Sequence, residues 1–163
     1  MSGRVDITLV PKPWGHETIW ARTDRYVGKI LHIKAGHALS VQYHTVKDET
    51  VYLLSGEMRY WVGKGSGQRA EGSEGRGQRV EGRAGSSQSR PLATGETPAA
   101  GRDPIPEMTD VLLRVGDAYR ITPHTVHYME AVTDCDVLEV STPDLDDVVR
   151  LKDRYGREGT SAP

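Results

Sequence analysis

The sequence predicts an all-β domain, a sandwich or barrel of many short strands with one short C-terminal helix and a long flexible insertion. Two observations predict it. Short segments rich in Val, Ile, Tyr and Trp are separated by single glycines, as in proteins built from many short strands. A glycine-rich stretch of low complexity divides these segments into two groups. The chain of 163 residues has the length of one domain, and we expect residues 1–163 to form one.

Ten segments carry the strand signal, because branched and aromatic side chains pack well on a pleated surface. Those before the insertion are Val5–Val10, His16–Ala21, Tyr26–Ile33, Leu39–His44, Glu49–Leu54 and Met58–Val62. Those after it are Val111–Val115, Tyr119–Ile121, His127–Val132 and Val137–Ser141.

Residues 63–107 form the predicted insertion. They hold 10 of the 18 glycines, and the sequence GQRAEG of 67–72 recurs as GQRVEG at 77–82. The repeat has no apolar face that could stack on a neighbour, so it is not a solenoid unit. Because its few apolar residues cannot offset the entropy of ordering the chain, we expect a flexible loop that joins two strands of one hairpin.

The only helix signal lies near the C-terminus. Thr142 can cap a helix, Pro143 suits the first helical position, and Asp144 favours the positive end of the helix dipole. The sequence therefore predicts a short helix over Pro143–Leu151.

Charge and cysteine content exclude several classes of protein. The formal net charge is −2, whereas a nucleic-acid-binding domain shows a strong basic excess. No apolar run approaches the roughly 18 residues of a membrane span, and Met1–Val10 lacks the features of a secretory signal. The single cysteine, Cys135, excludes internal disulfides and cysteine-cluster metal sites. We expect a cytoplasmic protein without nucleic-acid or membrane partners.

Four side chains form a candidate metal site. Gln42 and His44 are two residues apart in a predicted strand and therefore share a face. Glu49 begins the next strand and can return to that face, and His127 can complete the set if the strands close into a barrel. Two imidazoles, one carboxylate and one amide oxygen can bind a divalent metal and leave positions open for substrate or water.

This spacing resembles the two motifs of the cupin superfamily. The first motif is a glycine, five residues, His-x-His, three or four residues, Glu, six residues and Gly. The segment Gly36–Gly56 fits it at every spacing, with Gln42 in place of the first histidine. Gly116 and His127 match the second motif. Departures from that motif occur at Thr122, Pro123, His124 and Ala131. The resemblance implies a double-stranded β-helix, or jelly-roll barrel, with the insertion between its two motifs.

Among cupins, the chain is similar to type II phosphomannose isomerases, the C-terminal domains of bifunctional guanylyltransferase/isomerase enzymes. The shared segments are Pro13-Trp-Gly15, Leu39-Ser-Val-Gln-Tyr-His44 and Asp153-Arg-Tyr-Gly-Arg157. No guanylyltransferase domain accompanies them, so we expect a stand-alone cupin. The resemblance implies zinc as the metal, with iron, manganese or nickel as alternatives.

Two charged residues lie on apolar strand faces. Lys29 shares a face with Val27 and Leu31, where an unpaired lysine is costly. We expect it to contact the substrate, where Lys29 or Glu139 is the catalytic base, or to form a buried ion pair. Glu139 lies in an equally apolar strand and is either a general base with a raised pKa or a partner for Lys29 or an arginine.

The resemblance also implies that Arg150, in the predicted helix, and Arg157, in the tail, bind a substrate phosphate at the open end of the barrel. Lys47 and Asp48 lie in the loop between metal ligands, and we expect them to be solvated.

The leading functional prediction is a metal-dependent aldose–ketose isomerase that converts a sugar phosphate, as mannose-6-phosphate isomerases do. One alternative is a non-haem iron(II) dioxygenase that uses His44, Glu49 and His127. Another is a non-catalytic sugar-binding cupin. We also expect a homodimer, because exposed edge strands need to be covered.

Overall fold

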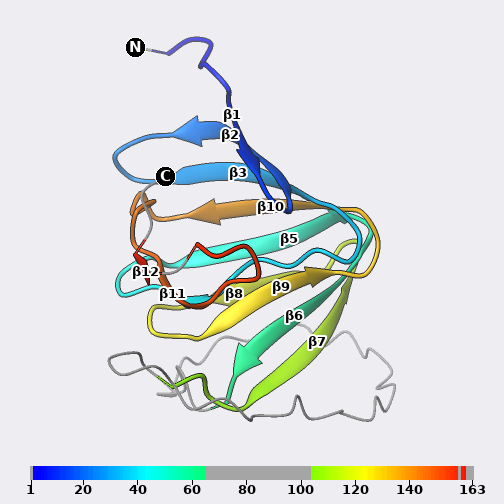
Figure 1. Cartoon of the computed structure of the whole chain (residues 1–163). Coiled ribbons are helices and arrows are strands. Elements are labelled where there is room, and N and C mark those ends of the chain that lie inside the picture. Colours follow the sequence, from blue (N-terminus) through cyan, green and yellow to red (C-terminus); the bar gives the residue numbers. More distant parts are fainter. Residues whose placement is uncertain (1, 65–103, 158, 161–163) are drawn as a thin grey trace, which may run out of the picture.

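The computed structural model describes residues 2–64, 104–157 and 159–160 and consists of two antiparallel six-stranded sheets (Figure 1). The first sheet runs in the order β1 (Thr8–Lys12), β2 (Gly15–Arg22), β3 (Val27–Ile33), β10 (Cys135–Ser141), β5 (Glu49–Ser55), β8 (Ala118–Ile121). The second runs β12 (Gly159–Thr160), β11 (Val149–Lys152), β4 (Val41–Tyr43), β9 (His127–Ala131), β6 (Glu57–Gly63), β7 (Met108–Arg114). This is a double-stranded β-helix, and the predicted all-β fold class is confirmed.

The hydrophobic core lies between the two sheets. Every second residue of β3, β5 and β10 is buried, as expected for strands with one face on a core. The largest fully buried apolar side chains of the first sheet are Leu31, Ile33, Leu53 and Ile121, and those of the second are Met58, Tyr60 and Met129. Residues from both sheets thus form one core, and each of the ten predicted strands is present with somewhat shifted ends.

The hairpin predicted around the insertion is confirmed. β6 pairs with β7 over its full length, from Glu57 opposite Arg114 to Gly63 opposite Met108. The N–H of Lys64 then donates to the carbonyl oxygen of Glu107 at 2.8 Å. The two ends of the inserted segment are therefore adjacent, and the predicted flexibility of 63–107 concerns mainly 65–103, which lie outside the described residues.

The predicted helix Pro143–Leu151 is wrong. Residues 143–148 form turns, and Val149–Lys152 is β11, which pairs with β4. Two tertiary interactions outweigh the capping signal of Thr142: the exposed edge of β4 offers a strand partner, and Asp147 binds backbone N–H groups of another loop. The described part of the chain contains no helix, and therefore none long and apolar enough to cross a membrane.

The glycines at the two ends of the first motif both adopt left-handed backbone conformations, with φ of 75° at Gly36 and 85° at Gly56. Gly56 is also tightly enclosed, because a Cβ there would lie 2.2 Å from the carbonyl oxygen of Asp134. Around Gly36, no atom of the described residues would come within 4 Å of such a Cβ. The turn from β5 to β6 thus requires glycine for two reasons, and the turn before β4 for one.

Candidate metal centre

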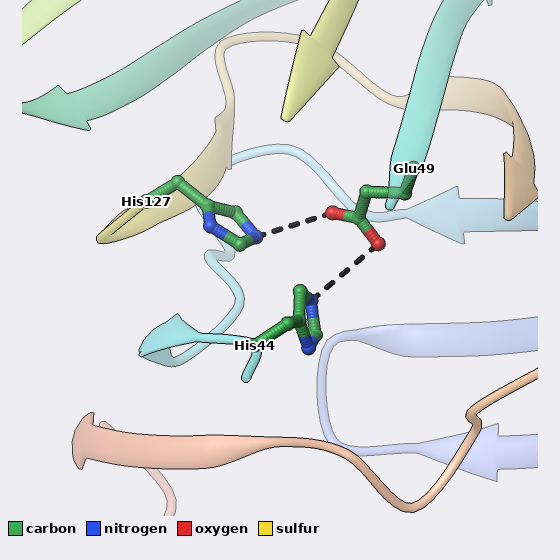
Figure 2. A group of neighbouring side chains, drawn as sticks. All are labelled: His44, Glu49 and His127. Atoms are coloured by element: carbon green, nitrogen blue, oxygen red, sulfur yellow. Dashed lines mark ion pairs between the residues drawn. The ribbon is translucent and has the colours of Figure 1, made fainter. Parts of the chain in front are cut away.

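Three side chains from separate segments of the chain meet inside the barrel (Figure 2). His44 directly follows β4, Glu49 begins β5, and His127 begins β9. Their exposed fractions are 0%, 3% and 0%, and one ligand atom from each lies within 4.8 Å of the other two. The predicted convergence of these residues is therefore confirmed, and they form a candidate site for a divalent metal.

The distances between the three side chains suit a shared ion. Nε2 of His127 lies 3.2 Å from Oε1 of Glu49, and Nε2 of His44 lies 3.5 Å from Oε2. Ligands bound about 2.1 Å from one ion are separated by about 3.0 Å at right angles and about 3.4 Å in a tetrahedron. Each histidine nitrogen thus lies about as far from an oxygen of Glu49 as two ligands of one metal lie from each other.

Backbone carbonyl groups fix both imidazole rings. Nδ1 of His127 donates to the carbonyl oxygen of Thr125 at 2.8 Å, and Nδ1 of His44 donates to that of Asp147. Because a carbonyl only accepts, each Nδ1 carries the proton and each Nε2 presents a lone pair. Both Nε2 atoms are buried without a hydrogen bond to any described residue. Two such atoms aimed at one carboxylate fit a bound metal ion.

The carboxylate of Asp147 orders the loop that joins the ligands. It accepts the backbone N–H groups of Thr45 at 2.9 Å, Val46 at 2.7 Å and Lys47 at 2.7 Å. Burial opposes ionisation of this carboxylate, but these hydrogen bonds more than offset it and hold its pKa well below the usual range. Asp147 therefore fixes His44 from two sides, through its own carbonyl and through the following loop.

Gln42 lies beside the triad, opposite His127 in the pairing of β4 with β9. Its Oε1 accepts a hydrogen bond from Oγ of Ser40 at 2.7 Å. Its role as a fourth ligand stays a prediction.

A cavity of about 110 Å³ opens onto His44 and Glu49. Apolar side chains such as Trp14, Leu31 and Met129 form part of its wall. The other charged residues that line it include Lys12, Glu17, Lys29, Glu139, Arg150 and Arg157. A small ligand in this cavity would contact His44 and Glu49 of the triad and several charged side chains of the wall.

Lys29 and Glu139 form a buried ion pair. They are directly opposite in the pairing of β3 with β10, and Nζ lies 3.7 Å from Oε1. Burial favours the neutral form of Glu139, but the charges of Lys29 and Lys47 more than compensate and lower its pKa. The predicted raised pKa is therefore wrong, because the sequence did not reveal the second lysine. The predicted roles of both residues in catalysis stay predictions.

Lys47 is the residue that sequence reasoning missed. It is 4% exposed, and its Nζ contacts Oε2 of Glu49 and lies 2.8 Å from Oε1 of Glu139. Burial would lower its pKa, but the two carboxylates raise it above the usual lysine value. The predicted solvated loop position is thus wrong. A signal was available, because Lys47 precedes Glu49 by two residues and alternate residues of an extended chain share a face.

Both predicted phosphate-binding arginines line the cavity, although Arg150 lies on β11 and not on a helix. Arg157 is held by Asp153, whose carboxylate accepts its Nε at 3.0 Å and its Nη2 at 2.9 Å. Nε of Arg150 is buried and forms no hydrogen bond with the described residues. Burial and the nearby charge of Arg157 lower the pKa of Arg150. Arg150 forms no ion pair with a carboxylate of the described residues. A bound anion could supply that contact.

Comparisons with known proteins give the fold. No family model and no curated protein matches the sequence. The chain is similar to KdgF from Halomonas sp., with 17% identity, a TM-score of 0.54, and coverage of 88% of this chain and 92% of that one. It is also similar to an RmlC-like cupin from Shewanella frigidimarina, with 11% identity, a TM-score of 0.55, and coverage of 86% and 87%.

A third similar structure is the capsular polysaccharide assembling protein CapF from Staphylococcus aureus, with 13% identity and a TM-score of 0.57. The match covers 91% of this chain but 33% of CapF. Identities this low establish the fold alone. The chain has the cupin fold, with a buried His-Glu-His triad where such a barrel can hold a metal.

Proposed function

We propose that this protein is a metal-dependent aldose–ketose isomerase that acts on a sugar phosphate. One observation carries the proposal: a single cavity joins His44 and Glu49 of the triad to Arg150, whose buried Nε has no hydrogen-bond partner among the described residues. A metal-binding group and an unsatisfied cation in one cavity suit a substrate with a carbonyl group at one end and a phosphate at the other.

The charges of the cavity allow a proton to be transferred next to the carbonyl group. A divalent ion bound by His44, Glu49 and His127 would supply a Lewis acid that polarises the carbonyl oxygen and the neighbouring hydroxyl. Glu139, ionised because of its lysine partners, takes the proton from C2 of the aldose and returns it to C1. A proton passes from the C2 hydroxyl to the C1 oxygen, so the reaction is balanced without a further reactant.

The other cations hold the substrate. Arg150 binds the phosphate, since its planar guanidinium group suits two phosphate oxygens. Arg157, whose Nε and Nη2 are held by Asp153, contacts the phosphate through its remaining donors. Lys29 keeps Glu139 ionised across their 3.7 Å ion pair. Because each cavity lysine, and Arg157 as well, already has a carboxylate partner, Arg150 provides most of the selectivity for an anion.

Isotope exchange tests the proposal. The protein is first analysed for bound metal, then incubated with mannose 6-phosphate in deuterated water. We expect deuterium at C2, and no exchange with the His127→Ala variant, which loses the metal. Unphosphorylated mannose is the matched control for the arginines. Absence of exchange by the metal-loaded protein with every sugar phosphate screened would contradict an isomerase.

A second candidate rests on the triad itself. Two histidines and one carboxylate are also the ligand set of non-haem iron(II) oxygenases. Stoichiometric iron together with oxygen consumption would favour this function over the isomerase. Binding of a sugar phosphate with neither exchange nor oxygen consumption would instead indicate a non-catalytic sugar-binding protein.

A further inference from the structure

Lys47 joins the candidate metal ligand to the candidate base. Its Nζ contacts Oε2 of Glu49 and lies 2.8 Å from Oε1 of Glu139. The side chains of Lys47, Glu49 and Glu139 are all buried, with 5%, 2% and 5% of their surface exposed. The two carboxylates come from β5 and β10, which are hydrogen-bonded neighbours in the first sheet. One ammonium group therefore bridges two functional side chains.

This bridge ends a chain of alternating charges along the cavity wall. Lys12 lies 3.6 Å from Glu17, Glu17 lies 3.7 Å from Lys29, and Lys29 lies 3.7 Å from Glu139. Glu139 is thus shared by two lysines, of which only Lys47 also touches a metal ligand. This difference makes Lys29 a matched comparison for Lys47.

The contact divides the two oxygens of Glu49 between different partners. Oε2 is bound to Lys47 and also lies 3.5 Å from Nε2 of His44, whereas Oε1 faces Nε2 of His127 at 3.2 Å and has no lysine contact. We propose that Lys47 is a positioning residue, which holds Oε2 so that Glu49 offers only Oε1 to the metal. The metal then keeps neighbouring coordination positions free for a ligand that binds through two oxygens.

The proposal narrows the substrate class. A carbonyl oxygen and the hydroxyl on the adjacent carbon can occupy two neighbouring positions of one ion, as can the two donor oxygens of an α-hydroxy acid. A carboxylate ligand bound through both oxygens would occupy one of those positions itself. This inference rests on the metal centre of the proposed function, and it does not depend on the isomerisation reaction.

A buried counter-ion without this role would also pair with Glu49, since an unpaired charge in the interior is destabilising. The two roles differ in what happens when Lys47 is removed. A counter-ion affects stability alone, whereas a positioning residue alters how Glu49 binds the metal. The test therefore needs a spectroscopic measurement on the metal itself.

Cobalt(II) provides that measurement, because its absorption weakens as coordination number rises. We expect Lys47→Met to weaken the visible absorption of the cobalt protein, since Oε2 of Glu49 becomes free to bind. The same variant should bind glycolate, a two-oxygen probe, about tenfold more weakly than the wild type. Lys29→Met removes the same charge beside Glu139 and should leave the cobalt spectrum unchanged.

Should Lys47→Met fail to fold, the double variant with Glu139→Gln restores the balance of buried charge and serves in its place. A wild-type spectrum and wild-type glycolate affinity in the Lys47 variant would overturn the proposal, as would an equal change in Lys29→Met. Failure of the wild type to bind cobalt would remove the metal centre, and the proposed function with it. A changed spectrum without isotope exchange would refute only the isomerase.

Discussion

Replacing Asp147 with alanine should destabilise the fold and weaken metal binding together, although Asp147 is not itself a ligand. Its carboxylate accepts hydrogen bonds from N–H of Thr45, Val46 and Lys47 and from Oγ1 of Thr45 at 2.5 Å. Hydrogen bonds to a charged group contribute about 1.5–3 kcal/mol each when buried. Thr45 and Val46 are exposed, so water replaces much of that contribution, and we expect a loss of about 2–4 kcal/mol in total.

The metal affinity should fall for a separate reason. Alanine keeps the backbone carbonyl that accepts Nδ1–H of His44, but without the carboxylate this carbonyl is no longer tied to the loop that follows His44. Disturbance of such supporting partners typically reduces metal affinity 10- to 100-fold. Chemical denaturation without metal measures the first effect, and titration with zinc measures the second. The exposed neighbour Asp146, replaced by alanine, is the control. The reasoning is refuted if the free energies of unfolding of the two variants agree within about 0.5 kcal/mol and both variants bind zinc equally.

Three further outcomes are expected. Gly56→Ala should lower the free energy of unfolding by several kcal/mol, and clearly more than Gly36→Ala, where only the left-handed backbone is strained, at about 1–2 kcal/mol. The denaturation midpoints of the two variants measure this difference. The hydrogen bond from His32 lowers the pKa of Asp136, so the ionised Asp136 stabilises the fold above about pH 4 and this stabilisation is lost below it. The difference in thermal midpoint between the wild type and Asp136→Asn should therefore shrink on acidification. A chelator should lower the thermal midpoint of the metal-loaded protein, since metal at 100 times its Kd adds about 2.7 kcal/mol, and the loss should be reversed by adding metal.

The sequence predicted those strands whose signal is local. In β3, β5 and β10, the β-branched residues and leucines either alternate with polar residues or lie on a buried face. Each of these three strands is present where the sequence predicted it. β11 was missed because its signal is not local. Thr142 and Pro143 resemble a helix start, and the pairing with β4 that overrides them involves residues about 100 positions away.

The metal triad was predictable for a similar reason. His44 and Glu49 lie on either side of one short loop, so their spacing in the sequence limits their distance in space. His127 begins β9, which pairs with β4 next to His44. The environment of Glu139 was not predictable. Its ion pair with Lys47 joins residues 92 positions apart, and no periodic pattern specifies which strand lies beside β10. The sign of its pKa shift therefore depended on topology and not on composition.

The arrangement of charges bears on the proposed binding of an anionic substrate. With a net charge of −2, the protein provides no general positive field. Within the cavity, Lys12, Lys29 and Lys47 each lie beside a carboxylate and are largely neutralised. Arg150 differs, because its Nε is buried without a partner among the described residues and a second guanidinium adds to the charge nearby. An anion that reaches Arg150 therefore relieves both an unsatisfied donor and a like-charge repulsion. Selectivity for an anionic substrate can thus depend on one position of β11, the strand that the sequence did not predict.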